Sequence, residues 1–291
     1  MWGAIACVCL LQTVPDPTTD RLPPDLIAAE VRAVEVDSDG AVWVGVRDRG
    51  LLEMVGEVVR PHADPSLPEG IADLLGDSSG LWAVGLGGVA RRTEGRWHAV
   101  ELPNAPRVVF SVTSEPDSGR HWFGTNRGAA LLHAGAWTVL TEADGLPHAV
   151  VHQVLVEPDG VVWLLCRRGL ARLVDGTIEV FRPDLNFRRA VVGPDGRPWF
   201  GTSGGLLRWN GEDFDVDLDG IVPYPLVTTV DGSVWAGSAS DGLLRYAAGV
   251  WGAPIPALED VEVFDVARAP DGAIWVASQD GLRRIPPGAS R

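Results

Sequence analysis

The stretch Asp195–Trp209, DGRPWFGTSGGLLRW, contains the pattern that decides the fold. An Asp-Gly pair precedes a short apolar run around Trp199, and a Gly-Gly pair precedes a second apolar run that ends at Trp209. Asp and Gly between apolar runs are typical of a β-hairpin, because both residues tolerate the positive φ that a primed turn needs. The stretch therefore predicts one strand before Asp195 and two antiparallel strands after it.

The same pattern recurs through the whole chain at a period of roughly 40 residues. A second glycine follows each repeated tryptophan by six or seven residues, and a third glycine precedes a further apolar residue in six repeats. Each unit therefore predicts a four-stranded antiparallel meander of the length of a propeller blade. The repeats are centred on Trp43, Trp82, Trp122, Trp163, Trp199, Trp235 and Trp275.

These repeats predict an all-β fold, a single seven-bladed β-propeller over residues 1–291, with the tryptophans packed between blades. The seventh repeat ends after its third strand, because Pro286 and Pro287 follow Gly281–Ile285 directly. We expect the apolar run 4–14 to supply the missing strand and to close the ring, which would cover unpaired sheet edges. Residues 1–14 could instead be the remnant of an export signal.

Composition disfavours several classes of partner. The formal net charge is -15 and the chain contains no lysine, so nucleic acid and anionic membranes would meet a repulsive overall field. No internal apolar stretch is long enough to predict an integral membrane segment.

Cys7, Cys9 and Cys166 show no metal-binding or redox spacing and are interpreted as free residues.

The repeats resemble a known family, the two-component regulator propeller repeats of extracytoplasmic sensor regions in hybrid histidine kinases. The segments Gly196–Leu206 and Trp122–Gly128 match its core pattern, and Thr141–Pro147 matches the preceding linker, of which Thr19–Pro23 is a weaker copy. The resemblance implies a bacterial sensor propeller outside the cytoplasm, periplasmic or secreted, coupled to a signalling protein. A cytoplasmic location would follow if the N-terminus were only a closing strand.

Candidate sites for metal or catalysis are few. His148 and His152 are four residues apart, but the segment reads as loop and then strand, with no predictable third ligand, so no metal or cofactor is predicted. The Asp-Gly turns lack the alternating acids and distal glutamate of a calcium loop. No paired carboxylates or nucleophile–base pair stand at a spacing that carries catalysis, so an enzyme is the less favoured interpretation.

The loops are the expected binding surface, because ligand sites on rigid scaffolds lie on loops. One face should collect the loops that follow each tryptophan strand and those that precede each inner strand, with His62 and Arg189 beside them. Several arginines on one face of an acidic protein favour capture of an anionic group. The predicted site residues are Arg47, Arg49, Asn126, Arg127, His148, Arg167, Arg168, Arg188, Asp241 and Gln279.

The sequence thus favours a non-enzymatic sensor or binding propeller that recognises a small molecule, a glycan or a protein at this face. A streptogramin-lyase-like or hydrolytic propeller enzyme with its site at the same mouth is the first alternative. A protein-interaction scaffold is the second.

Overall fold

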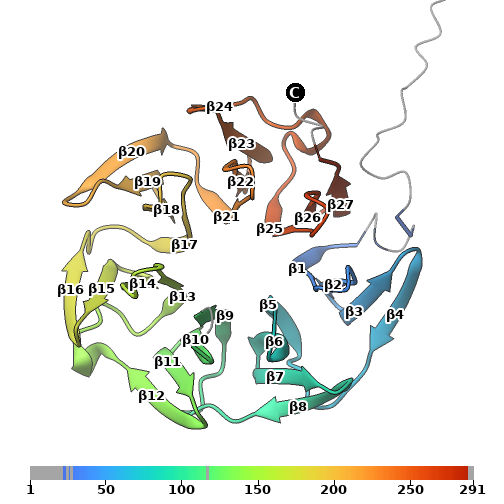
Figure 1. Cartoon of the computed structure of the whole chain (residues 1–291), viewed down its shortest axis with the longest axis horizontal. Coiled ribbons are helices and arrows are strands. Elements are labelled where there is room, and N and C mark those ends of the chain that lie inside the picture. The colour runs from blue at the N-terminus through green and yellow to red at the C-terminus, as the bar shows by residue number, and fades with distance from the viewer. Residues whose placement is uncertain (1–21, 24–25, 27–28, 116–117, 288–291) are drawn as a thin grey trace, which may run out of the picture.

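The computed structural model describes residues 22–23, 26, 29–115 and 118–287, and these residues form seven antiparallel sheets in a ring around a central axis (Figure 1). The prediction of an all-β seven-bladed propeller is confirmed. Two 3-10 turns lie between strands, η1 (Glu142–Asp144) and η2 (Pro256–Leu258), and Leu26 is also helical. None of the described helices has the length and apolar character needed to cross a membrane.

Each blade is a meander that runs outward from the axis, and the strands of one rank occupy equivalent places in all blades. The innermost strands are β1 (Val31–Val36), β5 (Gly70–Asp77), β9 (Val109–Glu115), β13 (Val151–Val156), β17 (Phe187–Val192), β21 (Pro223–Thr228) and β25 (Val263–Arg268). The tryptophan strands are β2 (Val42–Val46), β6 (Gly80–Leu86), β10 (Arg120–Thr125), β14 (Val162–Cys166), β18 (Pro198–Thr202), β22 (Val234–Ser238) and β26 (Ile274–Ser278). The third strands are β3 (Gly50–Val55), β7 (Gly88–Thr93), β11 (Gly128–His133), β15 (Leu170–Val174), β19 (Gly205–Trp209), β23 (Leu243–Ala247) and β27 (Gly281–Ile285). The outer strands are β4 (Val58–His62), β8 (Arg96–Val100), β12 (Ala136–Leu140), β16 (Thr177–Phe181), β20 (Phe214–Asp219) and β24 (Val250–Trp251).

The hairpins that carry the Asp-Gly pairs differ from the primed turns expected from sequence. In the first blade, Gly40 N–H donates to Asp37 O at 3.0 Å and Asp37 N–H donates to Ala41 O at 3.0 Å. Gly40 has a φ of +82°, whereas Asp39 is not among the residues with positive φ. This is a three-residue loop in which only the glycine is left-handed. The expectation of a two-residue turn was wrong, because one more residue belongs to the loop.

The repeated tryptophans pack between blades, as the sequence predicts. Trp163 and Trp199 are fully buried, and the other five are at most 7% exposed. Five of the indole N–H groups donate to a side chain at the preceding turn, and a buried donor without a partner would be costly. In the fourth blade, Trp163 Nε1 donates to Glu157 Oε1 at 2.6 Å, and in the first blade Trp43 Nε1 donates to Asp37 Oδ2 at 2.9 Å. In these two blades the acidic residue that opens the hairpin thus also anchors the tryptophan.

A glycine two residues after the tryptophan allows neighbouring blades to approach closely. A Cβ added at Gly201 would lie 2.7 Å from Pro223 O, and one added at Gly45 would lie 2.7 Å from Ile71 Cβ. In both cases the obstructing residue belongs to the innermost strand of the next blade. The glycine therefore sets the distance between blades at these junctions.

Blades 7 and 1 close the ring by apolar packing between their facing surfaces. Their facing surfaces form one apolar cluster that includes Val34, Trp275 and Leu282. Blade 7 has three strands among the described residues, as predicted. The proposed closing strand 4–14 lies outside the described residues, as do Cys7 and Cys9, whereas Cys166 is buried and free as predicted.

We expect Gly201→Val to lower the free energy of unfolding by about 1–3 kcal/mol, because its side chain would overlap the backbone of the next blade. Chemical denaturation followed by tryptophan fluorescence measures the change. Gly204→Ala is the matched control, because a Cβ there meets only ordinary contacts at 3.8 Å. Equal stability of the two variants would contradict the role given to Gly201.

Candidate functional site

The central axis is the place where all seven blades meet, and the innermost strand of each blade lies next to it (Figure 1). Every one of these strands has a β-bulge near its start, for example between Val31 and Ala33 in β1 and between Phe187 and Arg189 in β17. A bulge re-aims the extra residue, which here lines a cavity at the axis. The residues at the bulges are Arg32, Ala72, Phe110, His152, Arg188, Tyr224 and Phe264.

These seven side chains line one cavity of about 370 Å³. Cationic and aromatic groups adjoin in pairs around it. The Arg32 guanidinium carbon lies 3.9 Å from the centroid of the Phe264 ring, and that of Arg188 lies 5.1 Å from the Tyr224 ring. The rings hold both guanidinium groups by cation–π attraction, and the Arg32 guanidinium also forms an ion pair with Glu30.

Two nitrogen atoms in this cavity are buried and have no hydrogen-bond partner among the described residues. They are Nε2 of His152 and Nε of Arg188. The His152 ring also lies 5.2 Å from the Phe110 ring, centroid to centroid, which fixes its position. Other arginine Nε atoms among the described residues are also buried without a partner, so His152 Nε2 is the more informative of the two.

His152 is uncharged at neutral pH. Burial lowers the pKa of its imidazole to about 4, and the positive charges of Arg188, Arg189 and Arg167 act in the same direction. A neutral imidazole can donate or accept one hydrogen bond at Nε2, depending on its tautomer. The cavity therefore offers a neutral hydrogen-bonding group beside fixed positive charges.

Buried carboxyl groups occupy the positions next to the bulges and connect neighbouring blades. Asp265 Oδ2 accepts from Val34 N–H at 2.9 Å, and Asp73 Oδ2 accepts from Val112 N–H at 3.1 Å. In the fourth blade, Gln153 takes this role, with Oε1 accepting from the backbone of the fifth blade. One repeat position thus joins blade 7 to 1, blade 2 to 3 and blade 4 to 5.

These carboxyl groups are only partly ionised near neutral pH. Burial raises the pKa of Asp265 to about 7, the negative charge of Asp73 adds to the rise, and the Arg189 cation opposes it. Burial likewise raises the pKa of Asp73, and it raises that of Glu35 to about 8. The arginines of the cavity stay charged under the same conditions. The axial region is therefore more positive than a count of its acidic and basic residues indicates.

The predicted site residues are distributed over the mouth, and only Arg188 lines the axial cavity. Arg47 pairs with Glu30 at 2.9 Å, and Arg127 donates to Asn104 O at 2.7 Å. Three other predicted residues form hydrogen bonds within or next to their own loops. Asn126 Oδ1 accepts from Val108 N–H, and His148 Nδ1 accepts from Val150 N–H. Asp241 Oδ2 accepts from the hydroxyl groups of Ser238 and Ser240. The side chains of Arg49, Arg167, Arg168 and Gln279 are exposed.

Sequence reasoning missed Arg32, Phe110, Tyr224 and Phe264, and it did not connect His152 with a binding cavity. A signal was present, because these residues all precede the repeated tryptophan of their blade by 11 or 12 positions. Strict alternation of inward and outward side chains does not identify them, since the bulge inserts an extra residue and breaks that alternation.

We expect a pH dependence from Glu35 and Asp265. The unfolded chain ionises both near pH 4, whereas the folded protein holds the protons up to about pH 7 or 8. Stability should therefore fall as the pH rises from about 5 to 8, because over this range the folded state holds protons that the unfolded state has lost. Glu35→Gln keeps the oxygen that accepts from Gly76 N–H, Asp265→Asn keeps one of its two accepting oxygens, and the double substitution should flatten the decline.

The measurement is the melting temperature across this pH range. Exposed carboxyl groups provide the control pair, Asp39→Asn with Glu101→Gln, which should keep the decline of the parent protein. His152 contributes with the opposite sign below about pH 6.5, because only the unfolded imidazole binds a proton there, and it is present in every variant compared. An undiminished decline in the Glu35/Asp265 variant would refute the assignment.

Comparison with known proteins identifies the fold. No protein-family model and no curated protein matches the sequence. Among solved structures, the extracellular domain assigned to a hybrid two-component system of B. thetaiotaomicron is similar at a TM-score of 0.75 and 16% identity. The match covers 89% of this chain and 40% of that one, so this chain spans about two fifths of the length of its relative.

Two further structures match over most of both chains. The streptogramin B lyase has a TM-score of 0.72 and 15% identity, with 89% of this chain and 94% of the lyase covered. YCF48 bound to D1 peptide has a TM-score of 0.68 and 17% identity, with 91% and 95% covered. The chain therefore has the propeller fold that is found in these three structures.

Proposed function

We propose that this protein is a non-enzymatic binding propeller that holds an organic anion in the axial cavity. The observation that carries the proposal is the pair of buried, unpartnered nitrogens on His152 and Arg188, both in a cavity of about 370 Å³. A carboxylate would accept hydrogen bonds from both side chains, and charge-assisted bonds of this kind are about twice as strong as neutral ones.

The rest of the cavity fits the body of such a ligand. Phe110, Tyr224 and Phe264 offer aromatic surface, and the size falls within the usual range for small-molecule sites. The arrangement favours an organic acid over a neutral glycan, because a glycan would not use the local positive charge. The protein as a whole is acidic, so the site is a local reversal of charge.

A role in sensing follows from the likeness to a two-component system. In the similar structure, the propeller is part of an extracellular domain. By analogy, the present chain would work outside the cytoplasm and pass ligand binding to a signalling protein. A closed ring of blades fits this role. A ligand that touches several blades at the axis would change how those blades pack together.

We expect Arg188→Ala to weaken binding of a carboxylate at least tenfold, because a charged hydrogen-bond partner contributes about 1.5–3 kcal/mol. The probes are benzoate, phenylacetate, succinate and citrate, screened by thermal shift and measured by calorimetry. A ligand at 100 times its Kd adds about 2.7 kcal/mol of stability, which a melt detects readily. Arg197→Ala, at a hairpin far from the axis, is the control.

Arg168→Ala separates the axial site from the exposed loops. If binding depends on Arg168 and not on Arg188, the ligand occupies the rim that the loop pattern predicts, and the axial assignment fails. If none of the acids stabilises the protein, the anion-binding proposal fails.

His152 also supports a second candidate, an enzyme with its base at the axis. The Nε2 of His152 lies in a cavity without a hydrogen-bond partner, and a bound anion would raise the imidazole pKa from about 4 toward the range in which a general base works. The streptogramin B lyase shares the fold. Chemical change of a streptogramin B or of a bound acid, detected by mass spectrometry and lost in His152→Ala, would favour this candidate over a sensor.

A further inference from the structure

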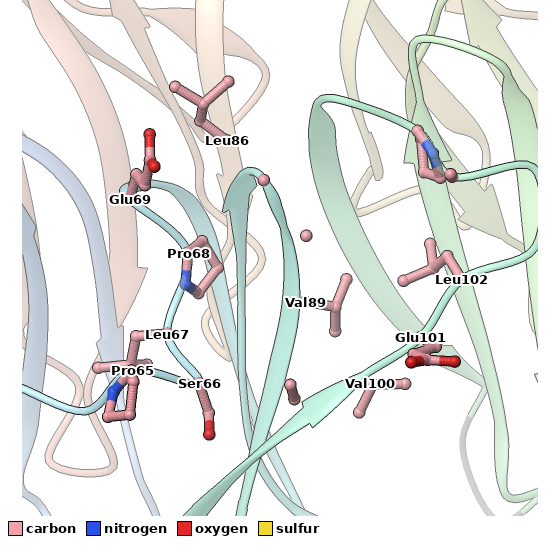
Figure 2. A pocket seen from close by; sticks show the side chains of 15 residues that line it. Pro65, Ser66, Leu67, Pro68, Glu69, Leu86, Val89, Val100, Glu101 and Leu102 are labelled. Carbon is pink, nitrogen blue, oxygen red and sulfur yellow. The ribbon is translucent and has the colours of Figure 1, made fainter.

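A second cavity adjoins the axial one over blade 2. It is a groove of about 580 Å³ between the connector 63–69 on one side and residues 99–106 on the other, with the β6–β7 turn between them (Figure 2). Leu86, in that turn, lines both this groove and the axial cavity. The two cavities are therefore neighbours along one path from the axis outward. The apolar walls are formed by Pro65, Leu67, Pro68, Val100 and Leu102.

The β6–β7 turn leaves this path open. It carries Leu86 and Gly87 where the equivalent turns carry Asn126-Arg127 in the third blade and Arg167-Arg168 in the fourth, so one of the two long polar side chains is replaced by a glycine. A Cβ added at Gly87 would meet nothing within 4 Å, so the space above the turn is free. Leu86 itself is 43% exposed, so its side chain provides apolar surface where the two cavities meet.

The charges change sign along this path. The axial end has Arg32, Arg188 and Arg189, whereas the groove has the exposed carboxylates of Glu69 and Glu101, one on each wall. A ligand that follows the path meets positive charge, then apolar surface, then negative charge. This order selects a molecule with an anionic end, an apolar middle and a cationic far part.

We infer that the ligand is the carboxyl-terminal segment of an extended peptide, with its terminal carboxylate in the axial cavity and apolar, then basic, residues in the groove over blade 2. The inference rests on the proposed function, since it places the carboxylate at the same Arg188 and His152. It adds the class of ligand and the direction in which the ligand lies.

The groove fits a peptide better than an acyl chain. The Ser66 side chain, the exposed glycine backbone at 87–88 and the two glutamates offer hydrogen bonds and negative charge beside the apolar walls. A hydrocarbon tail would leave these polar groups without partners and would cost their hydration. A peptide supplies amide groups for the backbone and a lysine or arginine for the carboxylates.

The test uses octapeptides with a free carboxyl terminus, random in the last four positions and with two arginines before them, binding to the full chain. We expect the amidated form of the best binder to bind about tenfold or more weakly, because it lacks the charged end. Charge reversal by Glu69→Arg with Glu101→Arg, and filling of the groove by Ala99→Trp, should each weaken the acid peptide at least fivefold.

Small carboxylates separate the two proposals. Benzoate reaches only the axial cavity, so the groove variants should leave its affinity unchanged. Glu57→Arg with Glu212→Arg makes the same charge change at exposed turns elsewhere and should leave both ligands unaffected. Benzoate binding without any effect of the groove variants on peptides would overturn the peptide inference alone. Tighter binding of decanoate than of any peptide, lost in Ala99→Trp, would overturn it in favour of an acyl ligand.

Discussion

The contact between the faces of neighbouring blades is the constraint on which the rest of this structure depends. A four-stranded meander cannot bury both of its faces alone, so each blade needs a neighbour on either side. Buried tryptophans such as Trp163 fill the interface, and glycines such as Gly45 and Gly201 let the next innermost strand approach to contact distance. The same logic joins blade 7 to blade 1, where Asp265 accepts from the backbone of Val34.

This packing dictates how a site can be built. Seven innermost strands surround one axis, and a bulge in each turns a single side chain toward it. The chemistry of the cavity is therefore assembled from residues about 40 positions apart in the chain, one from each blade. Changing one of them alters the ligand chemistry with little effect on the blade that carries it, because bulge residues take no part in the ladder.

The charge near the axis depends on which carboxyl groups burial keeps protonated, more than on the number of acidic and basic residues. The protein has a net charge of -15, yet the carboxyl groups nearest to the axis are the ones whose ionisation burial opposes. Arginine keeps its proton under the same conditions, so a positive site can exist inside an acidic molecule. The groove over blade 2, with its exposed glutamates, keeps the opposite sign.

The sequence by itself determined the number of blades, the order of strands and the packing role of the tryptophans, because local turn residues and a fixed period specify a repeated hairpin. It misjudged the turns that carry an Asp-Gly pair, such as Ser38–Gly40, where the loop holds one more residue than the pair indicates. Only the tertiary structure decided the site. Arg32, His152 and Arg188 converge because seven blades close into a ring and each bulge breaks the alternation of side chains, and both effects depend on contacts between distant repeats.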